Sequence, residues 1–130
     1  MTLREVRTGE APAPVGPYSQ AVRHGSSLFV SGQVPLDPTT GKLIPGDIAA
    51  QTERVIDNLE AVLRAGGSSL QQVVRATVYL TDLADFPRVN EVYASRFTGD
   101  PAPARATIQV AALPLGADVE IDLIAAVSEP

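Results

Sequence analysis

The segment Pro103-Ala104-Arg105-Ala106-Thr107-Ile108-Gln109-Val110 has the alternating pattern of a half-buried β-strand, with an arginine inside it. Alternate residues of a strand point to opposite faces, so Arg105, Thr107 and Gln109 share one face and the apolar residues share the other. We expect the apolar face to pack inward and Arg105 to point elsewhere. Because an unpaired guanidinium within a sheet is costly, Arg105 requires an anionic partner.

A second alternating segment, residues 118–126, follows a short loop at residues 113–117. Its apolar positions alternate with acidic ones that include Glu120 and Asp122. We expect the two segments to form an antiparallel hairpin in which a carboxylate lies on the same face as Arg105. Two interpretations remain open: Arg105 forms a structural ion pair with Glu120 or Asp122, or it marks a site for a small carboxylate with an acid or base nearby.

The rest of the chain predicts four further strands and two helices. We expect strands at residues 3–8, 21–24, 28–33 and 72–80, the first at a sheet edge and the next two as a hairpin. Apolar residues at three- and four-residue spacing predict a helix from Ile48 to Leu63, with Asp47 as its N-cap and glycines after its end. A second helix is expected from about Asp85, with Pro87 in its first turn.

This order of elements indicates an α+β fold in which two helices cover one face of a mixed sheet. The other face is then left uncovered, although it carries apolar residues such as Ile124 beside polar ones. Closed self-association is the usual way to hide such a face, so we expect an oligomer.

Composition favours one compact domain spanning residues 1–130. The chain is 45% hydrophobic and 19% charged, and it has no cysteine, which is compatible with a reducing cytoplasm. A net charge of -5 without a basic stripe argues against nucleic-acid binding. No apolar run is long enough to cross a bilayer, so we expect a cytoplasmic protein without a membrane partner. We expect no metal site, because Asp118, Glu120 and Asp122 are spread along one strand and no second histidine is available. The one histidine, His24, is interpreted as a surface residue.

Three segments, in order along nearly the whole chain, resemble the recurrent segments of the RidA (YjgF) family of reactive intermediate deaminases. They are Gly16-Pro17-Tyr18-Ser19-Gln20-Ala21, Val30-Ser31-Gly32-Gln33-Val34-Pro35, and the stretch from Pro103 through Pro114 to Ala126. The resemblance implies a chorismate-mutase-like fold and a homotrimer packed sheet to sheet, with sites in clefts between subunits.

The resemblance also implies a reaction: hydrolysis of 2-imino acids and their enamine tautomers, such as 2-iminopropanoate and 2-iminobutanoate, to 2-keto acids and ammonia. Arg105 would clamp the substrate carboxylate through two parallel hydrogen bonds, and Glu120 would hold and activate the attacking water. No metal or cofactor is implied. Such imines leak from pyridoxal-phosphate dehydratases, so the implied role is protective clearance.

Six further positions match family site residues, and each also has a purely structural interpretation. They are Tyr18, Ser31, Gly32, Asn90, Thr107 and Pro114. Tyr18 closes over the site or caps the core, and Ser31 and Gly32 let a ligand approach the backbone or form a bulge. Many relatives carry a cysteine where this chain has Thr107, which leaves substrate preference open. Asn90 and Pro114 are otherwise a solvent-facing helix residue and a turn proline.

Two other classes of function remain alternatives. One is a trimeric module that binds a small carboxylate without turnover. The other is an RNA-directed activity, ribonuclease or translation inhibitor, which the acidic charge and single histidine disfavour.

Overall fold

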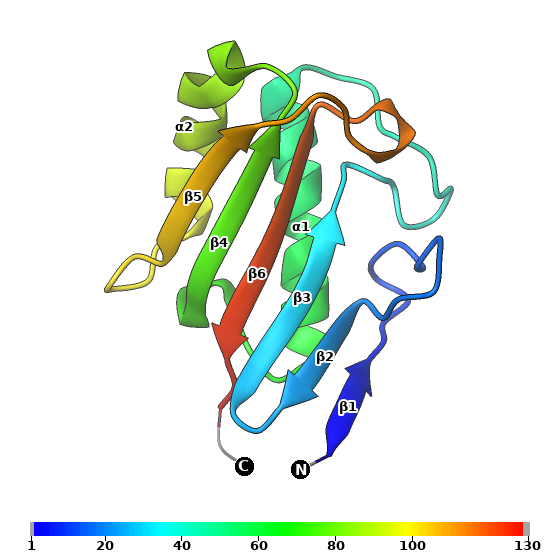
Figure 1. The fold of residues 1–130 in the computed structure, drawn as a ribbon, viewed down its shortest axis with the longest axis vertical. Helices are drawn as coiled ribbons and strands as arrows, with labels where there is room; N and C mark the ends of the chain where they lie inside the picture. The colour runs from blue at the N-terminus through cyan, green and yellow to red at the C-terminus, as the bar shows by residue number, and fades with distance from the viewer. Residues whose placement is uncertain (1, 129–130) are drawn as a thin grey trace.

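The structure, a computed structural model, describes residues 2–128 and contains one six-stranded sheet and two α-helices (Figure 1). The strands are β1 (Leu3–Val6), β2 (Ala21–His24), β3 (Ser27–Gln33), β4 (Val73–Leu80), β5 (Ala104–Gln109) and β6 (Val119–Ala126). The helices are α1 (Ile48–Ala65) and α2 (Phe86–Arg96), and short 3-10 turns lie at Leu70–Gln72, Leu83–Asp85 and Pro114–Gly116. The α+β prediction is confirmed.

The strand order is β1-β2-β3-β6-β4-β5, which contradicts the hairpin expected between β5 and β6. The β4 strand lies between them, antiparallel to β6 and parallel to β5. A parallel pair requires a crossover, and α2 supplies it by carrying the chain from the end of β4 back to the start of β5. The expected β2–β3 hairpin and the edge position of β1 are confirmed.

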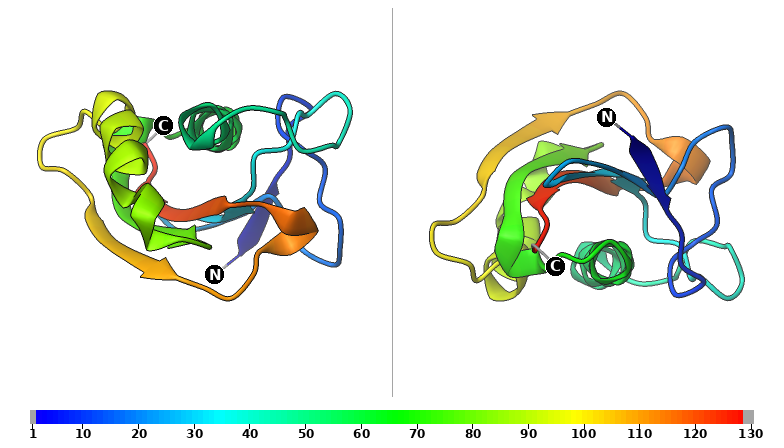
Figure 2. Two further views of the ribbon diagram at one scale, coloured as in Figure 1. Left: turned by 90° about the horizontal axis from the view of Figure 1, so that it is seen from above. Right: turned by 90° about the horizontal axis from the view of Figure 1, so that it is seen from below.

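Both helices lie on the same side of the sheet, as predicted (Figure 2). The N-terminus of α1 is capped by Asp47, whose Oδ1 accepts a hydrogen bond of 2.9 Å from the amide of Ala50. The core between the helices and the sheet is formed by the apolar stripe of α1 and alternate residues of the strands, including Leu59 and Val62 with Val78 and Leu123.

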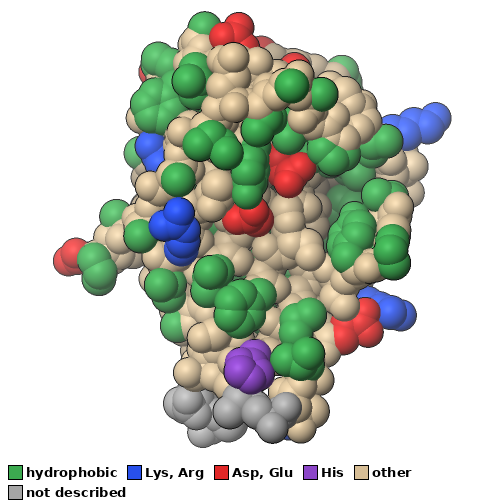
Figure 3. Space-filling view, in the orientation of Figure 1, with side chains coloured by type: hydrophobic (Ala, Val, Ile, Leu, Met, Phe, Trp, Pro, Cys, Tyr) green, Lys and Arg blue, Asp and Glu red, His purple; other side chains and the backbone are tan. Residues whose placement is uncertain are grey.

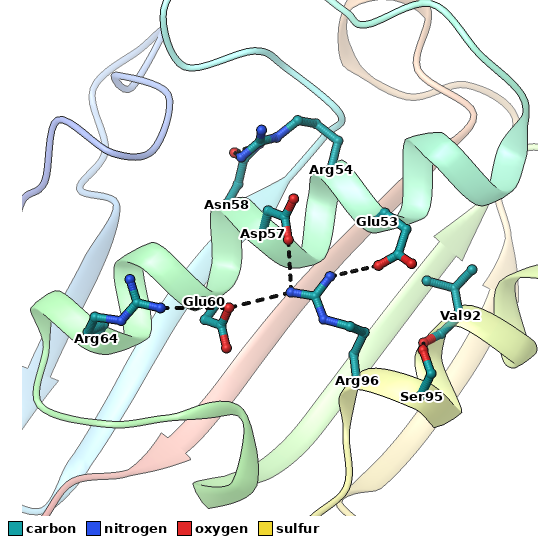
Figure 4. A network of polar contacts seen from close by, with 9 residues as sticks. All are labelled: Glu53, Arg54, Asp57, Asn58, Glu60, Arg64, Val92, Ser95 and Arg96. Atoms are coloured by element: carbon teal, nitrogen blue, oxygen red, sulfur yellow. Dashed lines mark hydrogen bonds and ion pairs between the residues drawn. The ribbon is translucent and has the colours of Figure 1, made fainter.

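The second helix is fastened to the first by Arg96, whose guanidinium contacts three carboxylates of α1 (Figure 4). Its nitrogens lie 2.7 Å from Glu53 Oε1, 2.8 Å from Asp57 Oδ1 and 3.5 Å from Glu60 Oε1. The Arg96 side chain is only 21% exposed. A shielded arginine bound to several carboxylates holds two elements in register better than an exposed single pair does.

The opposite face of the sheet is bare and mixes apolar with acidic side chains (Figure 3). Phe29 of β3 is 46% exposed and lies in register with Ile124 of β6, and Ile108 of β5 is 44% exposed. Within residues 2–128, no helix combines the length and the apolar character needed to cross a bilayer.

Candidate functional site

Arg105 lies on the helix-covered face of the sheet, which corrects the expectation that it would point away from the core. It is in register with Ala76 of β4, which is in register with Leu123 of β6, and both partners are buried under the helices. Its guanidinium carbon Cζ lies 4.6 Å from the ring centroid of Tyr93 and 5.5 Å from that of Phe86, both on α2. The rings supply the apolar and electrostatic surroundings that a cation can tolerate.

Among the described residues, Arg105 forms no ion pair, so the structural pair with Glu120 or Asp122 is wrong. Instead it borders a cavity of about 450 Å³ that is also lined by Leu83, Phe86 and Thr107. An arginine left without a carboxylate at the wall of a cavity is suited to binding an anionic ligand.

A second cavity, of about 480 Å³, is lined by Arg105 together with Asn90 and Tyr93 of α2. Arg105 therefore borders two cavities, and each of them is lined by a further predicted site residue, Thr107 in the first and Asn90 in the second. The hydroxyl of Thr107 is buried and has no hydrogen-bond partner among the described residues.

Glu120 lies on the opposite, open face of the sheet. It is in register with Tyr79 of β4, three residues from Leu123 along β6, so the two side chains of β6 point to opposite faces. The expectation that Arg105 and Glu120 share a face is therefore wrong within one chain. Glu120 lines a cavity of about 150 Å³ together with Tyr18, Gly32 and Pro114.

The surroundings of Glu120 favour its protonated form more than water does. Burial, assisted by the negative charge of Asp122, raises the pKa of Glu120 above its ordinary value. Asp122 accepts a hydrogen bond of 2.8 Å from the hydroxyl of Tyr79, which fixes its position on the same face. A carboxylate with a raised pKa beside a cavity is a candidate general base.

Gly32 makes room for this carboxylate. A Cβ atom at residue 32 would overlap Oε2 of Glu120 and lie 2.9 Å from its Cδ. The register between β3 and β6 shifts between Val30 and Gln33, so Ser31 and Gly32 form the bulge that was one interpretation of this segment. The bulge brings the backbone of β3 against Glu120.

Tyr18 and Ser31 belong to one loop-and-strand junction beside Glu120. Tyr18 is half exposed, so it does not cap the core, and its hydroxyl accepts a hydrogen bond of 3.2 Å from the amide of Val15. Its closure over the site stays a prediction. The Ser31 hydroxyl donates to the carbonyl of Ser19 at 2.6 Å and thereby ties the bulge to the Tyr18 loop. Ser31 therefore supports the site's shape.

Sequence reasoning missed several residues that build these cavities. Gln20 is buried, and its amide nitrogen donates to the carbonyls of Thr8 and Pro12 at 3.1 Å and 2.9 Å, which holds the loop before Tyr18. Its place inside the segment that carries the family resemblance was the available signal. Leu115, with φ of 62°, forms part of the wall near Pro114. A bulky residue in the left-handed region leaves no pattern in a sequence.

Nothing in the part of the chain that the structure describes groups three potential metal ligands from histidine, cysteine, aspartate and glutamate. Of the two acidic residues of β6, Asp122 accepts a hydrogen bond from the Tyr79 hydroxyl, and Glu120 lines the cavity beside Gly32.

Comparisons with known proteins agree with this architecture. Residues 8–127 match the family model described as Endoribonuclease L-PSP. The chain is 56% identical over 127 residues to Protein DfrA of Myxococcus xanthus, covering 96% of each chain. It is 48% identical over 120 residues to the 2-iminobutanoate/2-iminopropanoate deaminase of Mus musculus, covering 92% of this chain and 88% of that one.

Among solved structures, RidA from an Antarctic Psychrobacter superimposes with a TM-score of 0.91 at 47% identity, covering 95% of this chain and 99% of that one. Similarity of this extent, over nearly the whole chain and in both sequence and fold, leads to one conclusion: the chain belongs to the RidA (YjgF) family.

Proposed function

We propose that this protein hydrolyses 2-imino acids and their enamine tautomers, including 2-iminopropanoate and 2-iminobutanoate, to 2-keto acids and ammonia. The name of the mouse relative supports this reaction. The observation that carries it is the presence of two unlike half-sites. A guanidinium without an ion pair among residues 2–128 lies on one face of the sheet, and a carboxylate with a raised pKa lies on the other.

Each half-site contributes chemistry that imine hydrolysis needs. Arg105 binds the substrate carboxylate through two parallel N–H···O bonds, which orients the C=N carbon. Starting from the protonated imine, Glu120 takes a proton from water as the water oxygen bonds to that carbon, which gives a carbinolamine. Glu120 then returns this proton to nitrogen, and it takes up the hydroxyl proton as the C–N bond breaks and the C=O bond forms. The products are the 2-keto acid and ammonia, and neither step requires a metal or an organic cofactor.

A complete site requires a second copy of the chain, because the sheet itself separates Arg105 from Glu120. Asn90 and Thr107 accompany Arg105, whereas Tyr18, Gly32 and Pro114 accompany Glu120. The bare face, with Phe29 exposed near its centre line, supplies apolar area for association. We therefore propose a homotrimer in which the Arg105 half of one subunit meets the Glu120 half of the next.

The proposed biological role is protection of pyridoxal-phosphate enzymes by clearing the reactive imines that they release, which places the protein in the cytoplasm with them. Thr107 replaces the cysteine of many relatives. Its unpartnered hydroxyl, beside Arg105, is a hydrogen-bond donor that a thiol would supply only weakly.

An RNA-directed activity is the second candidate, because the matching family model is described as an endoribonuclease. The net charge of -5 opposes it, since RNA binding depends on neutralising phosphates. A trimeric module that binds keto acids without turnover is the third. Saturable binding of 2-oxobutanoate without imine hydrolysis would favour the binding module. Degradation of RNA by the unmodified protein, lost in Arg105→Ala, would favour the RNA-directed activity.

The deciding experiment generates 2-iminopropanoate and 2-iminobutanoate in place with an amino-acid oxidase and traps them with semicarbazide. The protein should suppress semicarbazone formation, with or without EDTA. Arg105→Ala should lower kcat/KM by roughly 30- to 1,000-fold, which corresponds to about 2–4 kcal/mol for a charge-assisted bidentate contact.

Circular dichroism and thermal melting must show that the variant is folded. Arg105→Lys, which keeps the charge but cannot bond bidentately, serves as a second variant. Turnover by Arg105→Ala at the rate of the unmodified protein would overturn the assignment.

A further inference from the structure

We infer that Tyr93 is a positioning residue for Arg105, and that the face of its ring holds the guanidinium in the orientation that binds the substrate carboxylate. This inference rests on the proposed function for the identity of the ligand. The placement of Arg105 itself can be measured without any ligand.

The distances between Arg105 and two aromatic rings support a positioning role for Tyr93. Arg105 Cζ lies 4.6 Å from the Tyr93 ring centroid, within the range of a cation–π interaction and closer than its 5.5 Å separation from Phe86. Arg105 has no ion pair among residues 2–128, so contact with these rings, and not with a carboxylate, is available to constrain its long side chain. A side chain ordered before the ligand arrives loses less conformational entropy on binding.

The ring is itself held rigidly. Tyr93 is only 8% exposed and stacks on Phe97, with ring centroids 4.2 Å apart and planes inclined by 18°. Phe86 and Tyr93 are seven residues apart, nearly two turns of α2, so they present their rings along one side of the helix. Arg96 fastens that helix to α1. The orientation of Arg105 is thus set by packed elements.

The ring rather than the hydroxyl performs this role. The Tyr93 hydroxyl is buried and has no hydrogen-bond partner among the described residues, although the ring borders the cavity that contains Asn90 and Arg105. Burial raises the pKa of Tyr93, while the charge of Arg105 acts in the opposite direction, so the phenol stays neutral at physiological pH. An unpaired buried hydroxyl lowers stability, and its removal should be tolerated.

The test compares Tyr93→Phe, which keeps the ring, with Tyr93→Leu, which removes it. Tyr93→Phe should melt at the same temperature as the unmodified protein or a few degrees higher, and it should bind 2-oxobutanoate within twofold of it. Tyr93→Leu should bind 2-oxobutanoate about tenfold more weakly and raise KM by a similar factor, with a smaller change in kcat. Val62→Ala, a buried change on α1, is the control for lost stability alone.

The ligand-free readout is the NMR signal of the Arg105 Nε–H group. Ring currents should shift it upfield in the unmodified protein and in Tyr93→Phe, and it should return towards the free-arginine position and become more mobile in Tyr93→Leu. If Nε–H is unshifted in the unmodified protein, or if Tyr93→Leu leaves it unchanged, the positioning role is overturned. If the NMR pattern appears but the unmodified protein does not hydrolyse imines, the proposed function fails and the positioning role stands.

A merely structural role makes a different prediction. Tyr93→Leu and Val62→Ala would then lower stability together and leave 2-oxobutanoate affinity unchanged. That result would overturn the inference, as would a loss of binding in Tyr93→Phe equal to that in Tyr93→Leu.

Discussion

The carboxylate of Glu120 occupies the space that a side chain at Gly32 would need on the open face of the sheet. A side chain at residue 32 would overlap Oε2 of Glu120. The absence of a Cβ atom at Gly32 therefore allows the carboxylate of Glu120 to occupy its position.

Gly32→Ala should displace this carboxylate while the fold persists, because the overlapping atoms belong to the flexible end of a side chain. We expect kcat for imine hydrolysis to fall by about tenfold or more, since proton transfer depends on the position of the base. Gly9→Ala is the matched control, because an added Cβ there meets nothing within 4 Å. Wild-type kcat in Gly32→Ala would contradict the role given to Glu120.

Glu120→Gln should reduce kcat by roughly 100-fold, with 2-oxobutanoate binding largely retained, because it removes the base and keeps the shape. The raised pKa of Glu120 also gives a prediction for stability. A carboxyl whose folded pKa is raised favours folding below its unfolded pKa and loses that contribution as the pH rises through the folded pKa.

Glu120→Gln should therefore melt a few degrees above the unmodified protein at pH 7 to 8, and the two curves should converge near pH 4. For the unmodified protein, kcat/KM should fall as the pH drops through the raised pKa, because protonation removes the base. A variant that is less stable at pH 8 than the unmodified protein would show that ionised Glu120 gains a favourable partner in the assembly.

Mixed assemblies should separate the two half-sites. Arg105→Ala and Glu120→Gln, unfolded together and refolded as trimers, should recover about a quarter of the clefts, because each contributing subunit is of the needed type half of the time. Arg105→Ala with Asn90→Ala should recover none, since Arg105 and Asn90 border the same cavity.

Light scattering should establish the trimer, and each variant refolded alone is the control. No recovery in the first mixture despite proven mixing, or an active monomer, would place the site within one subunit.

Arg96→Met should lower the free energy of unfolding by about 1–3 kcal/mol, because it removes a shielded cation from three carboxylates and leaves them facing one another. Arg88→Met is the control: Arg88 is exposed, and its one ion pair among the described residues is with Asp47 at 3.4 Å, so its loss should change stability by at most about 0.5 kcal/mol. Urea unfolding at low and high salt measures both. Equal effects of the two changes would show that the α1–α2 contact does not depend on Arg96.

Local elements were predictable because their signals are local. The spacing of apolar residues and the Asp47 cap are sufficient to predict α1, and the turn between β2 and β3 is sufficient to predict that hairpin. Strand neighbours were not predictable in the same way. Alternation tells which residues share a face, but it does not tell that α2 returns the chain to place β5 beside β4, two positions from β6 in the sheet order.

The arrangement of the candidate site was not predictable from the sequence. The family resemblance selected Arg105 and Glu120, yet the pattern around Arg105 suggested the wrong face. Its apolar neighbours on β5, such as Ile108, are the exposed ones, while Arg105 faces the rings of α2. A helix that offers aromatic faces can accept a cation where a simple inside–outside rule excludes it.

The register of the sheet also determines where the two ends of the described chain emerge. Leu3 is in register with His24 and Ala126 with Ser27, so β1 begins and β6 ends beside the same short β2–β3 turn (Figure 1). Glu120 lies near the opposite end of β6, where Gln33 faces Ile121. A reporter or surface tether attached at either end would project away from the Glu120 cavity, and a peptide bridge joining the ends would permit circular permutation, for instance with new termini opened at the exposed turn near Gly41.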